Sequence, residues 1–154
     1  MNIDLKGKRA IVCGSTQGIG KAVAEELASL GAAVTLVARN EDKLKEVQKA
    51  LSTQEGQDHH YVVADFAQPE YLKSAIHSYL EKVSEVHILL NNTGGPPAGT
   101  VYQADPDEFR KPFEMHIVGN QLLVQAVLPK MQAAGYGRII NIISTSVKEP
   151  IPGL

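Results

Sequence analysis

Residues 9–20 read Arg-Ala-Ile-Val-Cys-Gly-Ser-Thr-Gln-Gly-Ile-Gly, and this stretch decides the fold. The first five residues form a short apolar run typical of a strand. Gly14, Gly18 and Gly20 follow in a G-x-x-x-G-x-G spacing, and a segment with helical periodicity begins at the second glycine. Glycines between a first strand and a first helix let the backbone approach a pyrophosphate, which then faces the helix N-terminus. The stretch therefore predicts a dinucleotide-binding turn; the alternative is a glycine-rich turn without a ligand.

Short apolar runs continue to alternate with longer helical segments along the chain. They predict five strands, at residues 9–13, 33–38, 60–64, 86–90 and 138–143. Helices are expected at 18–30, from Asn40, from Pro69, and over 105–134, where Pro112 and Pro129 should bend or split the helix. The last strand is apolar on both faces, as in a strand buried between two helical layers. The fold class is therefore α/β, a three-layer Rossmann arrangement with a doubly wound parallel sheet in the order 3-2-1-4-5.

Composition limits the class of protein. The chain has 154 residues, a formal net charge of −2 and one cysteine, which suits one domain in a reducing compartment. A nearly neutral chain lacks the basic field that nucleic acid or an anionic membrane requires. We find neither a cysteine and histidine cluster with metal-ligand spacing nor an apolar run long enough for a membrane span. The sequence therefore predicts a cytoplasmic protein without a metal, a membrane partner or a nucleic-acid partner.

The end of the second predicted strand indicates which dinucleotide the turn would bind. In NAD-binding proteins an acidic residue near this point bonds the 2′-hydroxyl of the adenosine ribose. Here the residues are Val37, Ala38, Arg39 and Asn40, without an acid, and the guanidinium of Arg39 could bind a 2′-phosphate. We predict NADP(H) in preference to NAD(H). The alternative is that Arg39 is a solvated surface charge.

Four motifs resemble a classical short-chain dehydrogenase/reductase, over essentially the whole chain, and specifically a divergent branch related to 3-oxoacyl-acyl-carrier-protein reductases. They are the glycine loop, Asp65-Phe66, Asn91-Asn92-Thr93-Gly94 (Asn-Asn-Ala-Gly in the family) and 137–144, which ends in the serine of the active site. The resemblance implies that the pyrophosphate is bound by the glycine loop, namely Gly14, Ser15, Thr16, Gln17, Gly18, Ile19 and Gly20. It implies that the adenine and ribose groove is lined by Asp65, Phe66, Asn92, Thr93 and Gly94. The catalytic serine that it implies is Ser144.

Physical reasoning agrees on the serine, because Ser144 follows a strand whose carboxyl end meets the same sheet edge as the glycine loop. Its hydroxyl could hold a substrate carbonyl for hydride transfer; the alternative is a turn serine. The family's Tyr-x-x-x-Lys motif does not occur in these residues. His116 stands where the family has a relay asparagine, and it could replace that hydrogen bond, titrate, or be purely structural.

These observations predict an NADP(H)-dependent oxidoreductase that acts on a small carbonyl or alcohol substrate by hydride transfer. The alternative is a non-catalytic module that only binds or senses NADP(H). Residues 139–143 should form an apolar sheet edge that nothing after them covers. We therefore expect residues 1–154 to be the NAD(P)-binding N-terminal portion of a longer, homo-oligomeric protein, with the sheet incomplete on its C-terminal side.

Overall fold

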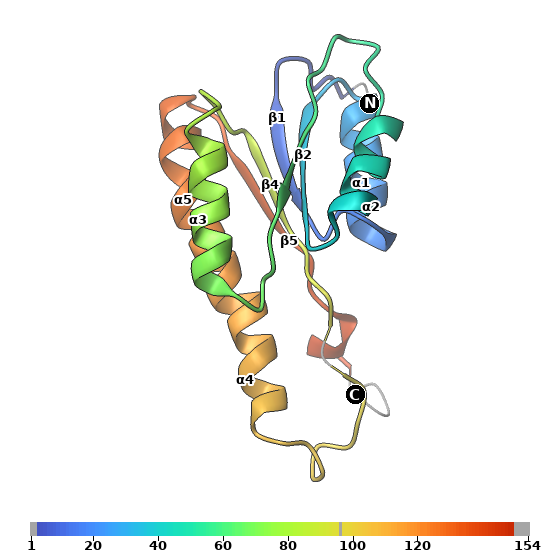
Figure 1. Cartoon of the computed structure of the whole chain (residues 1–154), viewed down its shortest axis with the longest axis vertical. Coiled ribbons are helices and arrows are strands. Elements are labelled where there is room, and N and C mark those ends of the chain that lie inside the picture. Colours follow the sequence, from blue (N-terminus) through green and yellow to red (C-terminus); the bar gives the residue numbers. More distant parts are fainter. Residues whose placement is uncertain (1–2, 96, 150–154) are drawn as a thin grey trace.

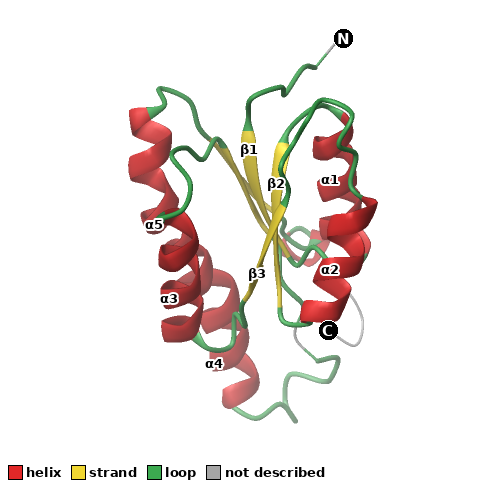
Figure 2. Ribbon diagram, turned by 45° about the horizontal axis from the view of Figure 1, so that its top comes forward, coloured by secondary structure: helices red, strands yellow, loops and turns green. Residues whose placement is uncertain are grey.

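The computed structural model describes residues 3–95 and 97–149 and confirms the predicted fold class. Its parallel strands form one sheet in the order β3-β2-β1-β4-β5, as expected. The strands are β1 (Arg9–Cys13), β2 (Ala33–Ala38), β3 (His60–Val63), β4 (Ile88–Asn91) and β5 (Arg138–Asn141). One face of the sheet carries α1 (Gly18–Ser29) and α2 (Glu41–Ala50), and the other carries α3 (Pro69–Leu80) and α5 (Gly119–Ala133), as Figures 1 and 2 show. Predictions that involve residues 1–2, 96 and 150–154 lie outside the described residues.

The central strand supplies two hydrophobic cores, one on each face of the sheet. Successive side chains of a strand point to opposite faces. Ile11 and Cys13 pack toward α3 and α5, whereas Ala10 and Val12 pack toward α1 and α2. All four are fully buried. The sheet is therefore anchored on both sides at β1, the strand that leads into the glycine loop.

The local signals for helix ends are confirmed. Asn40 caps α2, because its side-chain oxygen accepts a hydrogen bond of 2.9 Å from the backbone N–H of Lys43. Pro69 is the first residue of α3. Gly31 follows α1 with a φ of +96°, in the left-handed region that favours glycine. These signals fix where α2 and α3 begin and where the chain leaves α1 to enter β2.

The long fourth helix is split, as one of its two prolines predicted. It consists of α4 (Asp107–Phe113), a π-helical turn η1 (Glu114–Val118), and then α5. The change of register begins two residues after Pro112, which cannot donate a backbone hydrogen bond. Pro129 lies inside α5 without dividing it, so the helix is not split a second time there. The π-helical turn places His116 beside the loop that follows β4.

The prediction that the last strand is buried between two helical layers is wrong. All four residues of β5 are exposed, with Ile139 at 38% and Ile140 at 44%. The strand ends at Asn141, before Ile142 and Ile143, and β4 is its only neighbour in the sheet among the described residues. Burial of a strand depends on what packs over it, which its own apolar residues do not specify. An exposed apolar edge is present, as expected, but within the strand it consists of Ile139 and Ile140 rather than of the whole predicted run 139–143.

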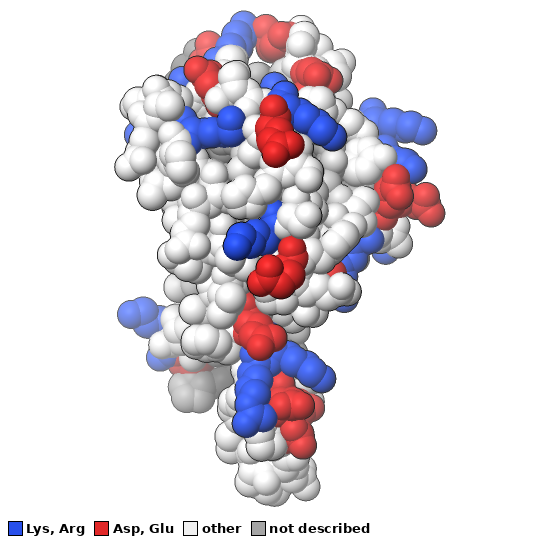
Figure 3. Space-filling view, turned by 60° about the vertical axis from the view of Figure 1, so that its left-hand side comes forward, with Lys and Arg blue, Asp and Glu red and all other residues white. Residues whose placement is uncertain are grey.

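The surface shows no dominant charge on the side that Figure 3 draws. Acidic and basic side chains are interspersed there over α3, α4 and α5. Within residues 3–95 and 97–149, no helix has both the length and the apolar character needed to cross a lipid bilayer.

Candidate cofactor site

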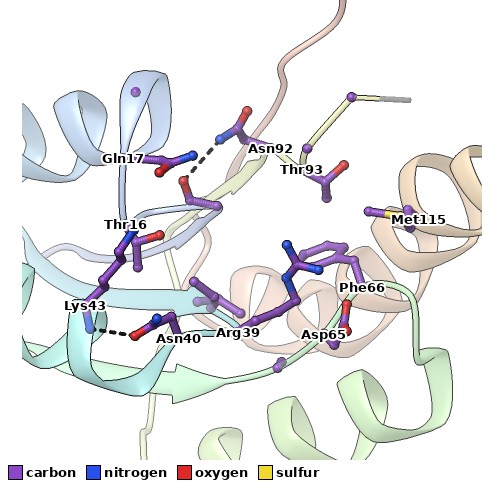
Figure 4. Close-up of a pocket in the computed structure, with 17 residues that line it drawn as sticks. Thr16, Gln17, Arg39, Asn40, Lys43, Asp65, Phe66, Asn92, Thr93 and Met115 are labelled. Atoms are coloured by element: carbon purple, nitrogen blue, oxygen red, sulfur yellow. Dashed lines mark hydrogen bonds between the residues drawn. The ribbon is translucent and has the colours of Figure 1, made fainter. Parts of the chain in front are cut away.

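The carboxyl ends of β1, β2, β3 and β4 open into a cleft of about 640 Å³ (Figure 4), which we call the cofactor cleft. Open parallel sheets bind ligands at this edge, where the strand order reverses. Most of the residues predicted to bind the cofactor line it: Gly14, Thr16, Gln17, Gly18, Arg39, Asp65, Phe66, Asn92, Thr93 and Gly94. Residues separated by up to eighty positions in the sequence are thus brought to one surface.

Two glycines of the loop, Gly14 and Gly20, are packed so closely that a side chain would not fit there. Gly14 and Gly18 have φ values of +59° and +54°. A Cβ atom at Gly14 would lie 2.7 Å from both the side-chain nitrogen and the backbone oxygen of Asn92, and one at Gly20 would overlap the carbonyl oxygen of Gly14. The Asn92 amide donates to the carbonyl oxygens of Cys13 and Gly14 at 3.3 and 3.5 Å. Asn92 therefore holds the turn in place, and the glycines leave its backbone uncovered by side chains.

Three predicted residues of the loop do not line the cofactor cleft. Ser15 is fully buried, and its hydroxyl donates to the carbonyl oxygen of Val37 at 3.4 Å. Ile19 is 57% exposed and faces a neighbouring cleft, while Gly20 packs against the Gly14 carbonyl. In the structure Ser15 and Gly20 make contacts that shape the turn.

The end of the cleft beside β2 is basic, and one of its cations was not predicted. Lys43 lines this end together with Arg39 and Asn40. Figure 4 shows its side chain running from α2 toward the glycine loop. Neither Arg39 nor Lys43 forms an ion pair within the part of the chain that the structure describes. The signal was available in the sequence, since Asn40 caps α2 and so places the first helical turn beside the cleft.

The acidic residues of that first turn are directed elsewhere. Glu41 pairs with Lys45 at 2.9 Å and accepts a hydrogen bond of 3.0 Å from the Tyr61 hydroxyl, and these contacts lower the pKa of the Glu41 carboxyl. Asp42 lines a shallow hollow on the other side of α2 with Lys45. Of the residues that line the cofactor cleft, only Asp65 is acidic, and it follows β3. The β2 end is therefore suited to an anion.

Asp65 and Phe66 border the cleft in different ways. The Asp65 carboxylate accepts a hydrogen bond of 2.9 Å from the backbone N–H of Ala67, which turns the chain after β3. Phe66 is only 6% exposed, and its ring packs on Gly119, where a Cβ atom would lie 3.1 Å from it. Phe66 therefore joins the cleft wall to α5.

A second cleft, of about 720 Å³, adjoins the first, and we call it the Ser144 cleft. Asn92, Thr93 and Gly95 line both clefts. The Ser144 oxygen accepts hydrogen bonds from the backbone N–H and the hydroxyl of Ser146, at 3.1 and 2.7 Å. Ser144 thus has the contacts of a turn serine, and it follows an exposed strand, contrary to prediction. Because both bonds use its lone pairs, its own proton remains available to a ligand.

The comparison with known proteins agrees with this geometry. The family model of the short chain dehydrogenases matches residues 8–154. The chain belongs to the short-chain dehydrogenase family. It is 37% identical over 150 residues to the human "Inactive hydroxysteroid dehydrogenase-like protein 1", covering 96% of this chain and 45% of that protein. It is 31% identical over 144 residues to the 3-oxoacyl-[acyl-carrier-protein] reductase FabG of Aquifex aeolicus, covering 94% and 58%.

Solved structures of short-chain dehydrogenases superpose closely on the chain. The L-sorbose reductase of Gluconobacter frateurii, complexed with NADPH and L-sorbose, has a TM-score of 0.92 at 32% identity and covers 99% of this chain and 58% of that one. A 3-oxoacyl (acyl-carrier-protein) reductase of Agrobacterium tumefaciens with NADP bound has a TM-score of 0.88 at 27% identity, covering 99% and 58%. This short-chain dehydrogenase spans about half the length of the curated relatives that it matches.

Asn91 links the side chains of β4 and β5 at the carboxyl edge of the sheet. It is fully buried, and its amide nitrogen donates to the side-chain oxygen of Asn141 at 2.9 Å. The two residues are partners in the register of β4 and β5. Asn91 therefore ties the strand before Thr93 to the strand that leads to Ser144.

The other titratable residues considered for reactivity or metal binding, Cys13, His59 and His60, make contacts that serve packing and hydrogen bonding within the fold. Cys13 is fully buried, and burial raises the pKa of its thiol to about 12, so it packs rather than reacts. His59 accepts a hydrogen bond of 3.0 Å from the Val34 N–H, while His60 pairs with Asp58. The described residues contain no group of three histidine, cysteine or acidic side chains that could hold a metal ion.

Proposed function

We propose that this short-chain dehydrogenase is an NADP(H)-dependent oxidoreductase that exchanges a hydride between the nicotinamide and a small carbonyl or alcohol substrate. The observation that carries the cofactor preference is the basic β2 end of the cleft, where Arg39 and Lys43 have no carboxylate partner among residues 3–95 and 97–149. The solved relatives that carry NADPH or NADP support the same preference. A 2′-phosphate at this end would be bound by two cations, whereas NADH offers them only a hydroxyl.

The residues of the chain would divide the work along the two clefts. Backbone N–H groups of the glycine loop and the N-terminus of α1 bind the pyrophosphate. Asp65 lines the adenosine side after β3. Ser144 would donate a hydrogen bond from its free O–H group to the substrate carbonyl oxygen and so hold the substrate in place. The bound cofactor supplies or accepts the hydride.

We also propose that residues 1–154 form the NAD(P)-binding portion of a longer, homo-oligomeric protein. The support for the first part is the coverage of 45–58% of the relatives' length. The support for the second is an apolar stripe at intervals of four residues, Phe109, Phe113 and Ile117, which are 57%, 58% and 56% exposed. In Figure 1, α4 projects from the body of the molecule and so presents part of this stripe to a second copy.

A second candidate function is a module that binds NADP(H) without catalysis. Two observations favour it: the human and Pongo abelii relatives are both named as inactive dehydrogenase-like proteins, and the Ser144 oxygen accepts two hydrogen bonds within a turn. This candidate uses the same cleft and predicts the same cofactor preference. It differs only in the absence of turnover.

The test is a titration of the purified chain with NADPH and with NADH, for the wild type and for Arg39→Ala. We expect Arg39→Ala to weaken NADPH binding by about tenfold or more and to leave NADH binding within about twofold. An unchanged preference would reject Arg39 as the determinant. NADPH oxidation in the presence of ketones and aldehydes then separates the two candidates, because binding without turnover by the whole protein favours the module.

A further inference from the structure

His87 lies at the amino ends of the strands, the edge of the sheet opposite the cofactor cleft. It directly precedes β4 and is only 4% exposed. Its backbone N–H donates to the carbonyl oxygen of Arg9 at 2.9 Å, and its own carbonyl oxygen accepts from the N–H of Arg138 at 2.8 Å. Arg9 and Arg138 are the first residues of β1 and β5. His87 therefore joins the starts of three neighbouring strands.

The imidazole of His87 forms a further bond to β1. Its Nδ1 atom accepts a hydrogen bond of 3.0 Å from the backbone N–H of Arg9. A backbone N–H can only donate, so Nδ1 carries no proton in this arrangement, and the single ring proton of the neutral imidazole lies on Nε2. Nε2 lies 3.5 Å from a carboxylate oxygen of Glu85, which accepts hydrogen bonds. Both ring contacts are therefore those of one neutral tautomer.

A second buried histidine caps the neighbouring central strand in the same way. His59 directly precedes β3 and is 7% exposed, and its Nδ1 accepts a hydrogen bond of 3.0 Å from the N–H of Val34 in β2. Because β3 pairs with β2 and β4 pairs with β1, the two histidines hold equivalent places at the amino edge. They differ at Nε2, which in His59 lies 2.8 Å from the carbonyl oxygen of Ser52 and in His87 faces a carboxylate. The acceptor role of Nδ1 is therefore a repeated feature of this edge.

Protonation of His87 is incompatible with its side-chain bond to β1. An imidazolium carries a proton on each ring nitrogen, so Nδ1 would point an N–H group at the N–H group of Arg9. Burial lowers the pKa of His87, the cations of Lys8 and Arg9 lower it further, and the Glu85 carboxylate opposes them. The cap on β1 and a positive charge on the ring therefore exclude each other.

Further charged or titratable groups surround His87. They border the same hollow or lie beside its ring, and they are Lys8, Arg9, Glu55, Asp58, Tyr136 and Arg138. Lys8 and Arg138 both lie over the Tyr136 ring, 4.6 Å from its centroid. Glu55 and Asp58 pair with Lys6 and His60. Within the part of the chain that the structure describes, Glu85 is thus the only acidic side chain paired with His87.

We propose that His87 is a proton-sensitive cap of β1, which holds the start of this strand against β4 while neutral and releases it when protonated. The cap needs no cofactor, so it stands apart from the proposed function. The unfolded chain takes up this proton near the ordinary histidine pKa of about 6.5, whereas the folded chain takes it up only at lower pH. The stability from the cap is therefore complete above about pH 6.5 and is lost progressively as the pH falls below that value. Because β1 leads into the glycine loop, the release acts on the strand that carries the cofactor turn.

Urea denaturation between about pH 7.5 and about pH 5.5 tests the cap by comparing the wild type with His87→Asn. The asparagine Oδ1 can replace Nδ1 as the acceptor but does not titrate in this range. We expect the unfolding equilibrium constant of the wild type to rise, relative to that of His87→Asn, by up to about tenfold per pH unit below about 6.5. His77→Gln, at an exposed histidine of α3, is the matched control and should keep the wild-type pH dependence. Parallel curves for the wild type and His87→Asn would contradict the proposal.

NMR spectra of the folded wild type test the cap without relying on the folding of a variant. Long-range ¹H–¹⁵N spectra should show the ring proton of His87 on Nε2 at about pH 7.5 and a titration midpoint below about 6.5. Glu85→Gln removes the opposing carboxylate and should move this midpoint to still lower pH. As the ring takes up its proton, the exchange protection of the Arg9 amide should fall by about threefold or more relative to that of Val127 in α5. A ring proton on Nδ1, a midpoint at or above about 6.5, or constant relative protection of the Arg9 amide would overturn the proposal.

Discussion

Substituting alanine at each of the three glycines of the loop separates the cost of a positive φ from the cost of steric overlap by the added Cβ atom. Gly18→Ala meets no atom within 4 Å but must adopt a φ of +54°, so it should lower the free energy of unfolding by about 1–2 kcal/mol. Gly14→Ala meets the same backbone strain, with a φ of +59°, and adds overlap with Asn92 at 2.7 Å. Overpacking typically costs another 1–3 kcal/mol, which gives a total of about 2–5 kcal/mol.

Gly20→Ala isolates the second cost. Gly20 is the third residue of α1 and has ordinary helical φ, so alanine brings no backbone strain there and even favours the helix by about 1 kcal/mol. Its Cβ atom would nevertheless overlap the Gly14 carbonyl oxygen, which belongs to the backbone and cannot rotate away. We therefore expect a net loss of stability together with weaker binding of NADPH.

Urea denaturation followed by circular dichroism measures these differences. With a slope of about 2 kcal/mol per molar urea, the midpoint should fall by about 1–2.5 M for Gly14→Ala and by about 0.5–1 M for Gly18→Ala. Equal shifts for the two variants would show that the close approach of Asn92 adds no cost. A Gly20→Ala variant as stable as the wild type would refute the reasoning about the turn.

Three further predictions concern charge, burial and the sheet edge. Lys43→Met should weaken NADPH binding by about three- to tenfold and leave NADH binding unchanged. The control Lys45→Met removes a lysine that pairs with Glu41 outside the cleft, and it should change the binding of neither nucleotide. Equal effects of the two variants would reject Lys43 as a determinant of the NADPH preference. Burial gives the Cys13 thiol a pKa of about 12 in the folded protein, against 9.0 in the unfolded reference. The thiol of the unfolded chain therefore ionises first as the pH rises. The free energy of unfolding should consequently fall by up to about 1.4 kcal/mol per pH unit between these two values. Cys13→Ala should flatten this decline in urea titrations, and parallel curves would contradict the assignment. Ile140→Lys on exposed β5 should change the unfolding free energy by less than about 0.5 kcal/mol and reduce self-association in sedimentation experiments; unchanged association would show that the edge is not used.

Local signals in the sequence predicted most of the fold. The apolar run before Gly14, the Asn40 cap and Pro69 each act within a few residues, so their effect can be inferred without knowing the rest of the molecule. The exposure of β5 could not be inferred in this way. Its isoleucines fit a buried strand equally well, and their burial depends on neighbours that are distant in the sequence.

The candidate site was predictable to the extent that it follows from strand ends. The carboxyl ends of parallel strands meet at one edge, which brings Gly14, Asp65 and Asn92 together. The sequence did not reveal that Ser15 faces inward, because the orientation of a loop residue depends on the turn geometry. Nor did it reveal the contact between Thr93 and His116, which joins residues from two elements and depends on the register of a π-helical turn.

The central claim is that the cofactor cleft binds NADP(H) and that its basic end distinguishes the phosphate from the hydroxyl. Isothermal titration of the wild-type chain with NADPH and NADH at fixed ionic strength tests it most directly. We predict that NADPH binds at least about tenfold more tightly than NADH, and that the difference decreases as salt is added, because the two cations are exposed. Equal affinities, tighter binding of NADH, or no binding of either nucleotide would contradict the claim.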